Sequence, residues 1–308
     1  MADLITLNAE YGIPEQVLFT EGPGGLVFAE LTNIYGHAVI ALQGGHLISW
    51  VPRERRSVIW LSPDAKFASG KSIRGGIPVC WPWFGDHPRE SSFPAHGFAR
   101  TTLWRVMGAE ETSAGGTRLV LNMEQNNEAR QRWPFSYDLI LSITLGAELM
   151  IELVTRNIGM TPITIGEALH TYFEVADVRN IAIHGLDGCE YLDKVDGMVR
   201  KRQAGPITFN GEIDRVYMDT VANCFIDDPG FNHRIHISKR GSLSTVVWNP
   251  WIEKAAKMGD LGADGYLKMV CVESANAAGN AVLIATGDEH RLVVTYRLES
   301  LPSGPVDI

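Results

Sequence analysis

The chain of 308 residues is 45% hydrophobic and 20% charged, with a formal net charge of −9 and a pI near 5.5. Such a composition is typical of a globular protein with a large core, and the acidic balance argues against nucleic acid as a partner, because nucleic-acid binding depends on basic patches. No stretch approaches the roughly 20 apolar residues of a membrane-spanning helix, and the N-terminus lacks the pattern of a signal peptide. We therefore expect a cytoplasmic protein with no membrane partner.

No linker or shift in composition divides the chain, so we expect a single domain over residues 1–308 with its core at about 25–299. Residues 1–24 are weakly patterned and predict a loose lead-in, and the end of the chain predicts a loose tail. The cysteines stand far apart with no C-x-x-C pair, which favours free thiols over a disulfide framework or a zinc ribbon. They are Cys80, Cys189, Cys224 and Cys271.

Beyond residue 25 the chain consists of short segments rich in Val, Ile, Leu and aromatic residues, separated by Gly, Asn or Pro. Helical periodicity is confined to two short stretches, around 126–132 and 253–260. Many strands without intervening helices predict an all-β fold of antiparallel sheets stacked as a sandwich. The expected strand segments are 26–33, 37–51, 57–62, 103–111, 117–125, 135–159, 161–175, 180–186, 208–219, 234–240, 243–251, 281–287 and 291–300.

The stretch from Ser72 to Arg100 is the exception to this pattern. Four prolines at short intervals exclude a helix or a central strand, and five aromatic residues provide enough apolar area to pack the segment against a core. Long ordered loops of this kind are usually functional. We expect this loop to form one wall of a ligand pocket.

Two later strands carry polar groups that proton transfer would need. In the segment 167–175, His170 shares a face with Ala168 and Tyr172. In the segment 268–276, Glu273 shares a face with Cys271, and a carboxylate at the end of an apolar strand is well placed for a raised pKa. A histidine held by a backbone group and a glutamate that caps a turn remain the alternatives.

The loop also carries Arg74, His96 and Arg100. Guanidinium groups fit phosphate oxygens, so the two arginines indicate a local anion clamp in an otherwise acidic protein. Tryptophan rings could stack on the apolar face of a sugar, although core packing explains them equally well. The four tryptophans considered are Trp81, Trp83, Trp248 and Trp251.

Six motifs in order carry a family resemblance over about residues 25–299: RGGIPVCWPWFG, HGFAR, EALHTYF, EIDRVY, WNPW and CVESAN. Together they resemble the hexose-6-phosphate mutarotases, also called glucose-6-phosphate 1-epimerases, within the aldose 1-epimerase group. The resemblance implies a galactose mutarotase-like β-supersandwich. It also implies interconversion of the α and β anomers of a hexose 6-phosphate by general acid/base ring opening, with no metal or other cofactor.

The resemblance places the family's catalytic pair on His170 and Glu273. It places substrate-binding residues on Arg74, His96, Arg100 and Asp214. The arginines, with Lys71 as a further candidate, would hold the phosphate. Some relatives have Gln before the His of HGFAR, where this chain has Ala95, so only the backbone can make a contact there.

Other functions remain open at this point. A mutarotase for unphosphorylated aldoses would have the same fold and the same acid and base. A non-catalytic sugar-phosphate-binding protein would keep only the anion clamp, and a glycosidase would usually need a second carboxylate opposite Glu273. We expect a small-molecule sugar phosphate as the ligand and a monomeric protein.

Overall fold

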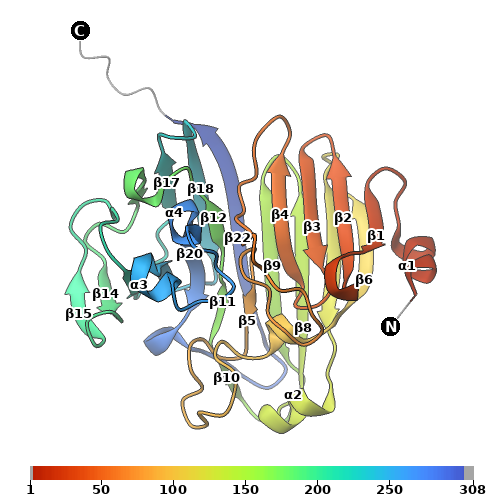
Figure 1. Cartoon of the computed structure of the whole chain (residues 1–308). Coiled ribbons are helices and arrows are strands. Elements are labelled where there is room, and N and C mark those ends of the chain that lie inside the picture. Colours follow the sequence, from red (N-terminus) through yellow and green to blue (C-terminus); the bar gives the residue numbers. More distant parts are fainter. Residues whose placement is uncertain (1–2, 302–308) are drawn as a thin grey trace.

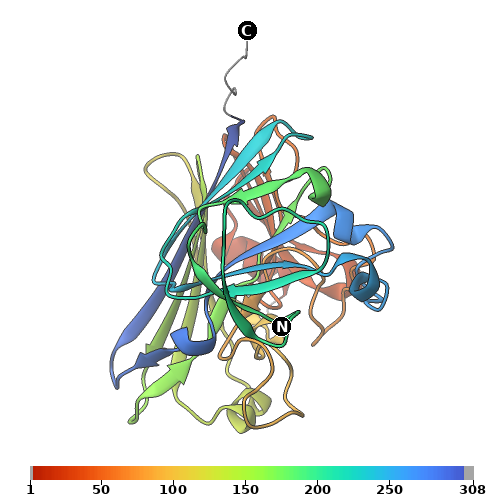
Figure 2. The same ribbon diagram turned by 90° about the vertical axis from the view of Figure 1, so that its left-hand side faces the viewer.

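The computed structural model describes residues 3–301 and consists mainly of β-strands (Figures 1 and 2). Every pair of named strands is antiparallel. The fold is therefore all-β, as the spacing of apolar segments predicts. The α-helices are short: α1 (Leu4–Tyr11), α2 (Asn127–Arg132), α3 (Trp251–Ala255) and α4 (Gly265–Lys268), and four 3₁₀ turns lie at Pro23–Gly25, Ala99–Thr101, Val178–Asn180 and Ala278–Asn280.

Two eight-stranded sheets, a four-stranded sheet and a two-stranded sheet build the described part of the molecule. The N-terminal sheet contains, in spatial order, β1 (Val17–Glu21), β2 (Val27–Asn33), β3 (Gly36–Ala41) and β4 (His46–Pro52). The long sheet contains β13 (Ala182–His184), β17 (Cys224–Asp228), β18 (His233–Arg240), β22 (Glu289–Ser300), β9 (Leu149–Asn157), β8 (Tyr137–Leu145), β7 (Thr117–Met123) and β6 (Trp104–Glu111).

The third sheet, here called the site sheet, carries the residues of interest. It contains β15 (Val199–Arg202), β14 (Glu190–Asp193), β16 (Ile213–Tyr217), β19 (Ser244–Asn249), β20 (Met269–Asn276), β11 (Glu167–Leu169) and β5 (Val79–Cys80), with β12 (Tyr172–Glu174) also paired to β20. A separate two-stranded sheet pairs β10 (Ile163–Ile165) with β21 (Val282–Ile284).

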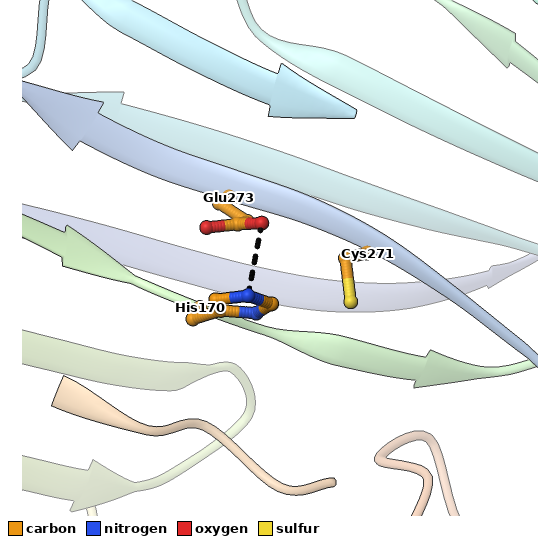
Figure 3. A group of neighbouring side chains, drawn as sticks. All are labelled: His170, Cys271 and Glu273. Carbon is orange, nitrogen blue, oxygen red and sulfur yellow. Dashed lines mark ion pairs between the residues drawn. The ribbon is translucent and has the colours of Figure 1, made fainter. Parts of the chain in front are cut away.

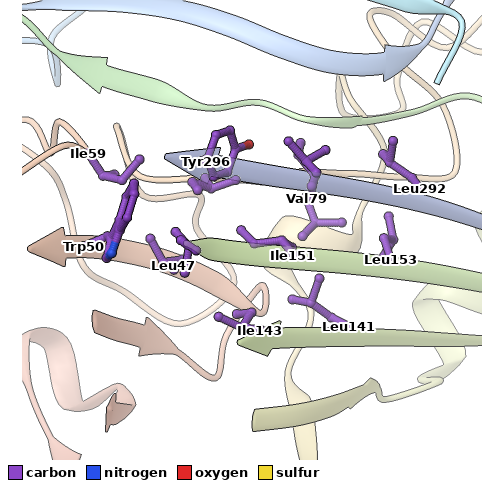
Figure 4. Close-up of a cluster of buried hydrophobic side chains, with 14 of the residues drawn as sticks. Leu47, Trp50, Ile59, Val79, Leu141, Ile143, Ile151, Leu153, Leu292 and Tyr296 are labelled. Carbon is purple, nitrogen blue, oxygen red and sulfur yellow. The ribbon is translucent and has the colours of Figure 1, made fainter. Parts of the chain in front are cut away.

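The main core lies between the long sheet and the other two sheets (Figure 4). Leu292 and Tyr296 from β22 pack there with Leu47 and Trp50 from β4 and with Val79 from β5. Burial alternates along β7, whereas every residue of β20 is buried. One face of β20 packs into the main core. The other face is also buried and forms the floor of the candidate site described below.

The start of the chain differs from expectation. A loose lead-in was expected for residues 1–24, but α1 and the edge strand β1 occupy most of the described part of this region. Asp3 caps α1 by accepting a hydrogen bond from the backbone of Ile5, and Asn8 bonds the backbone of Phe19 on β1. These side-chain hydrogen bonds hold α1 and β1 in place, although this part of the sequence has no strong apolar pattern.

The loop from Ser72 to Arg100 packs through its aromatic residues, as predicted. Trp81 is fully buried and meets Trp133 and Tyr137 at ring-centroid distances of 4.8 and 4.6 Å. At Gly97 the backbone has a φ of +73°, and a Cβ there would lie 1.9 Å from the carbonyl oxygen of Trp81. Only glycine permits this approach, which folds the loop back so that His96 and Arg100 face the site sheet.

No helix within residues 3–301 is long and apolar enough to cross a membrane.

Candidate active site

A cleft of about 300 Å³ opens over the face of the site sheet that is turned away from the main core. The six residues to which the family resemblance assigned catalysis and substrate binding all line it: Arg74, His96, Arg100, His170, Asp214 and Glu273. A larger hollow of about 460 Å³ beside α1 and β1 has no His, Lys or Arg among its lining residues. Acid/base chemistry and anion binding therefore both point to the smaller cleft.

Strand geometry explains how the acid and the base meet. On β20, Val270 and Val272 enter the main core, whereas Cys271 and Glu273 point to the cleft side. His170 lies in the interruption between β11 and β12, both of which pair with β20. This interruption places the imidazole of His170 against the carboxylate of Glu273 (Figure 3).

The pair is buried and close. Nε2 of His170 lies 3.4 Å from Oε1 of Glu273, whose side chain is 1% exposed. Burial and the charge of Asp214 raise the pKa of Glu273, whereas burial, His96, Arg100 and Arg74 lower the pKa of His170. Both shifts favour the uncharged form of the pair, in which the carboxyl group keeps its proton and the imidazole is neutral. Oε2 of Glu273 and Nδ1 of His170 are buried without a hydrogen-bond partner, so both groups retain bonding capacity.

His96 completes this side of the cleft. It adopts a φ of +66°, its backbone N–H donates to the carbonyl of Gly85, and its ring centroid lies 5.6 Å from that of His170. Burial, with Arg100, Lys194 and Arg74, lowers the pKa of His96 to about 3. The ring is therefore neutral, and it can donate one hydrogen bond and accept another.

The two predicted arginines differ in how they are held. Nε of Arg74 lies 3.1 Å from Oδ1 of Asp260, and its Nη1 donates to the hydroxyl of Tyr172. Arg100 donates from Nη2 to the carbonyl of Ala95 and has no carboxylate within 4.0 Å among residues 3–301. Arg100 therefore retains an uncompensated charge, and the backbone of Ala95 orients it.

The sequence did not single out two lysines in the cleft. Nζ of Lys194 lies 3.0 Å from Oδ2 of Asp214, and Nζ of Lys254 lies 2.7 Å from Glu212 and 3.8 Å from Asp214. Both lysines follow ordinary strand or loop residues, so no sequence signal marks them. Asp214, which is 7% exposed, therefore lies against the ammonium groups of two lysines.

Some predicted contributors lie elsewhere. Lys71 is exposed and is not among the residues that line the cleft, so a direct phosphate contact from Lys71 has no support in this structure. Of the four tryptophans considered for sugar stacking, Trp248 alone lines the cleft. The indole N–H groups of Trp81 and Trp83 bond to Thr155 and to the carbonyl of Pro94, and these two rings serve core packing.

The model of the aldose 1-epimerase family matches residues 28–297. The chain belongs to the aldose 1-epimerase family. A protein of Escherichia coli named "Putative glucose-6-phosphate 1-epimerase" is 38% identical over 242 residues, which cover 78% of this chain and 80% of that protein. The name of this relative includes a phosphorylated sugar.

Solved structures agree with this family assignment. A crystal structure named as a "putative mutarotase" from Salmonella typhimurium superposes with a TM-score of 0.87 at 32% identity, covering 94% of this chain and 96% of that chain. A galactose mutarotase related enzyme from Lactobacillus acidophilus has a TM-score of 0.72 at 13% identity, covering 90% and 98%. The second likeness shows the fold alone, which is galactose mutarotase-like, as the resemblance implied.

Proposed function

We propose that this mutarotase interconverts the α and β anomers of a hexose 6-phosphate, with glucose 6-phosphate as the preferred substrate. The observation that carries the proposal is the His170–Glu273 pair at 3.4 Å in one cleft with the uncompensated guanidinium of Arg100. The first feature suits proton exchange with a sugar, and the second suits an anion. The name of the Escherichia coli relative supports the same substrate.

Ring opening removes the proton of the anomeric hydroxyl and delivers a proton to the ring oxygen. In the proposed mechanism Glu273 is the base and His170 is the acid. After the open-chain aldehyde turns over its other face, the same two groups act in reverse to close the ring. A pair that shares one proton fits this reaction, because each step takes a proton at one site and gives a proton at the other.

In the free protein the two pKa shifts favour the form with the shared proton on Glu273, so the proposed direction requires its transfer to His170 when the sugar binds. Arg74 and Arg100 lower the pKa of His170. A phosphate group bound between these arginines would offset their charge and raise the pKa of His170. Phosphate binding thus promotes the protonation state that ring opening needs.

Recognition of the sugar is divided among the remaining groups. Asp214 accepts hydrogen bonds from sugar hydroxyls, and the neutral ring of His96 bonds near the ring oxygen. Trp248 lies at the cleft wall, where its ring centroid is 6.0 Å from that of His170 and its face can stack on the pyranose.

We also propose that the sheets form a single catalytic domain, since one continuous hydrophobic cluster joins all three of the larger sheets.

The test is NMR exchange between the two anomers, with glucose and glucose 6-phosphate compared side by side. The wild-type protein should accelerate exchange of the phosphate ester strongly and that of glucose weakly. Equal acceleration of both sugars would assign the protein to unphosphorylated aldoses. Tight binding of glucose 6-phosphate without acceleration would make it a binding protein instead.

A further inference from the structure

A third potential ligand lies beside the acid/base pair and has no role in the proposed mechanism. Cys271 stands two residues before Glu273 on β20, and its side chain is fully buried. One ligand atom each from His170, Cys271 and Glu273 lie within 4.8 Å of one another (Figure 3). Nitrogen, thiol sulfur and carboxylate oxygen therefore converge on one point at the floor of the cleft.

The spacing suits a tetrahedral metal ion. Bonds of about 2.0–2.2 Å from zinc to nitrogen and oxygen imply that two such ligands lie about 3.3 Å apart. Nε2 of His170 and Oε1 of Glu273 are already 3.4 Å apart. The sulfur of Cys271 lies within 4.8 Å of the other two atoms and would have to approach them to about 3.6 Å by rotation of its side chain.

The types of ligand select the class of metal. A thiolate and an imidazole favour zinc, cobalt and similar ions over magnesium or calcium, which prefer oxygen ligands. The charges also balance, because a thiolate and a carboxylate together neutralise a divalent ion. Arg74 and Arg100 would repel a free cation, but they face a neutral centre once both acidic ligands have lost their protons.

We propose that His170, Cys271 and Glu273 form an inhibitory site for a zinc-class divalent ion. Because His170 and Glu273 line the cleft, the fourth coordination position of the ion would be open to the cleft. The ion displaces two protons, one from the His170–Glu273 pair and one from the thiol, so binding strengthens as the pH rises. Metal and sugar use the same two side chains and exclude each other.

The surroundings suit a reversible site better than a permanent one. Histidines that hold a resident metal usually bond a carboxylate or carbonyl through their second nitrogen. Nδ1 of His170 is buried without a hydrogen-bond partner. The imidazole is therefore not prepared for metal in advance, and we expect a chelator to restore the metal-free protein fully.

Titration with cobalt tests the site without any activity measurement. Cobalt added to the metal-free protein should bind one equivalent and produce the near-ultraviolet charge-transfer band of a cobalt–thiolate bond. Calorimetry with zinc should give the same stoichiometry, and glucose 6-phosphate should reduce the apparent affinity for zinc. A wild-type protein that gives no such band overturns the proposal, whether or not the protein is a mutarotase.

Cysteine variants identify the ligand. Cys271→Ala should abolish the band and weaken zinc binding at least 10-fold, about 1.4 kcal/mol. Cys80→Ala is the matched control, because Cys80 is equally buried on the same sheet and lies outside the group of three. Cys189→Ala controls for the partly exposed thiol. A band that persists in folded Cys271→Ala, or in Cys271→Ser if the alanine variant does not fold, also overturns the proposal.

Discussion

Two histidine–glutamate pairs lie close together in this protein, and the pKa of the histidine is shifted in opposite directions in the two pairs. His170 faces Glu273 in the cleft, at 3.4 Å. His290 faces Glu167 on the opposite side of β11, at 2.9 Å, and Asn276 also donates to Glu167. Glu167 precedes His170 by three residues, so one short segment of chain contributes to both pairs.

The surroundings of the two imidazoles explain the difference. Burial lowers the pKa of His170, and nearby Arg100 and Arg74 lower it further. Burial also lowers the pKa of His290, but the hydrogen bond and charge of Glu167, with the carbonyl of Gly241, outweigh burial and raise it. Cations around the first pair favour the neutral form of His170, whereas Glu167 favours the protonated form of His290.

The largest predicted effect is on activity: substitutions in the His170–Glu273 pair should strongly reduce it, whereas a substitution in the His290–Glu167 pair should not. Glu273→Gln and His170→Asn should each reduce the acceleration of anomer exchange by about 10²–10⁴-fold, because each removes one partner in proton transfer. Glu167→Gln makes the same chemical change in the His290–Glu167 pair and should retain activity. NMR exchange with glucose 6-phosphate measures all three variants. Loss of activity in folded Glu167→Gln, with activity retained in Glu273→Gln, would reverse our assignment.

The effect on stability should be reversed: a substitution in the His290–Glu167 pair should destabilise the protein more than one in the His170–Glu273 pair. Glu167→Ala leaves the charge of His290 without its partner and should lower the free energy of unfolding by about 3 kcal/mol. Glu273→Gln removes a buried carboxyl that has an unpaired oxygen, and should leave stability unchanged or increase it. Urea denaturation monitored by circular dichroism gives both values. A larger loss in Glu273→Gln than in Glu167→Ala would show that the cleft pair is the structural one.

Removing the charge of Arg100 from the cleft should shift the pKa of His170 upward, in the direction of the shift at His290. Arg100→Ala should lower kcat/KM for glucose 6-phosphate about 10–100-fold, through loss of charge-assisted hydrogen bonds worth about 1.5–3 kcal/mol, and should not lower kcat/KM for glucose. The pKa of His170 should rise, as an NMR titration of its ring protons would show. Arg105→Ala is the control, because Arg105 is an exposed arginine on β6 outside the cleft. An unchanged preference for the phosphate ester would exclude Arg100 as the clamp.

The smallest effect concerns pH. Because the pKa of His290 is raised on folding, its contribution to stability is complete below the unfolded value of about 6.5 and is lost as the pH rises through the folded value. The difference in unfolding free energy between the wild type and His290→Gln should therefore shrink between pH 6 and pH 9. Urea titrations at several pH values test this. A difference that grows with pH would mean that burial, not Glu167, dominates the pKa of His290.

Local sequence patterns predicted much of the fold. The hairpins formed by β6 with β7 and by β8 with β9 follow from alternating apolar runs and glycine turns. The prediction for 253–260 was displaced, because α3 begins at Trp251 and ends at Ala255. The lead-in was missed because α1 and β1 depend on hydrogen bonds from single polar side chains, which leave no periodic pattern.

The sequence predicted the main residues of the candidate site but not the residues that contact and orient them. Motifs marked all six predicted lining residues, but nothing in the sequence distinguished Lys194 or Lys254 from surface lysines. Tyr172 and Asp260, which hold Arg74, were missed for the same reason. Contacts made across 98 and 186 residues of chain leave no local signal.

The sequence by itself determined the strand composition, the acidic balance and the chemical groups available for proton transfer and anion binding, because these depend on local patterns and residue type. Only the tertiary structure decided the surroundings of the two His–Glu pairs. His170, in the interruption between β11 and β12, lines the cleft, whereas Glu167 on β11 pairs with His290. The cations that surround His170 come from distant segments. The protonation state of each pair is therefore a property of the assembled sheets, since burial and distant charges, not residue type, set the pKa values.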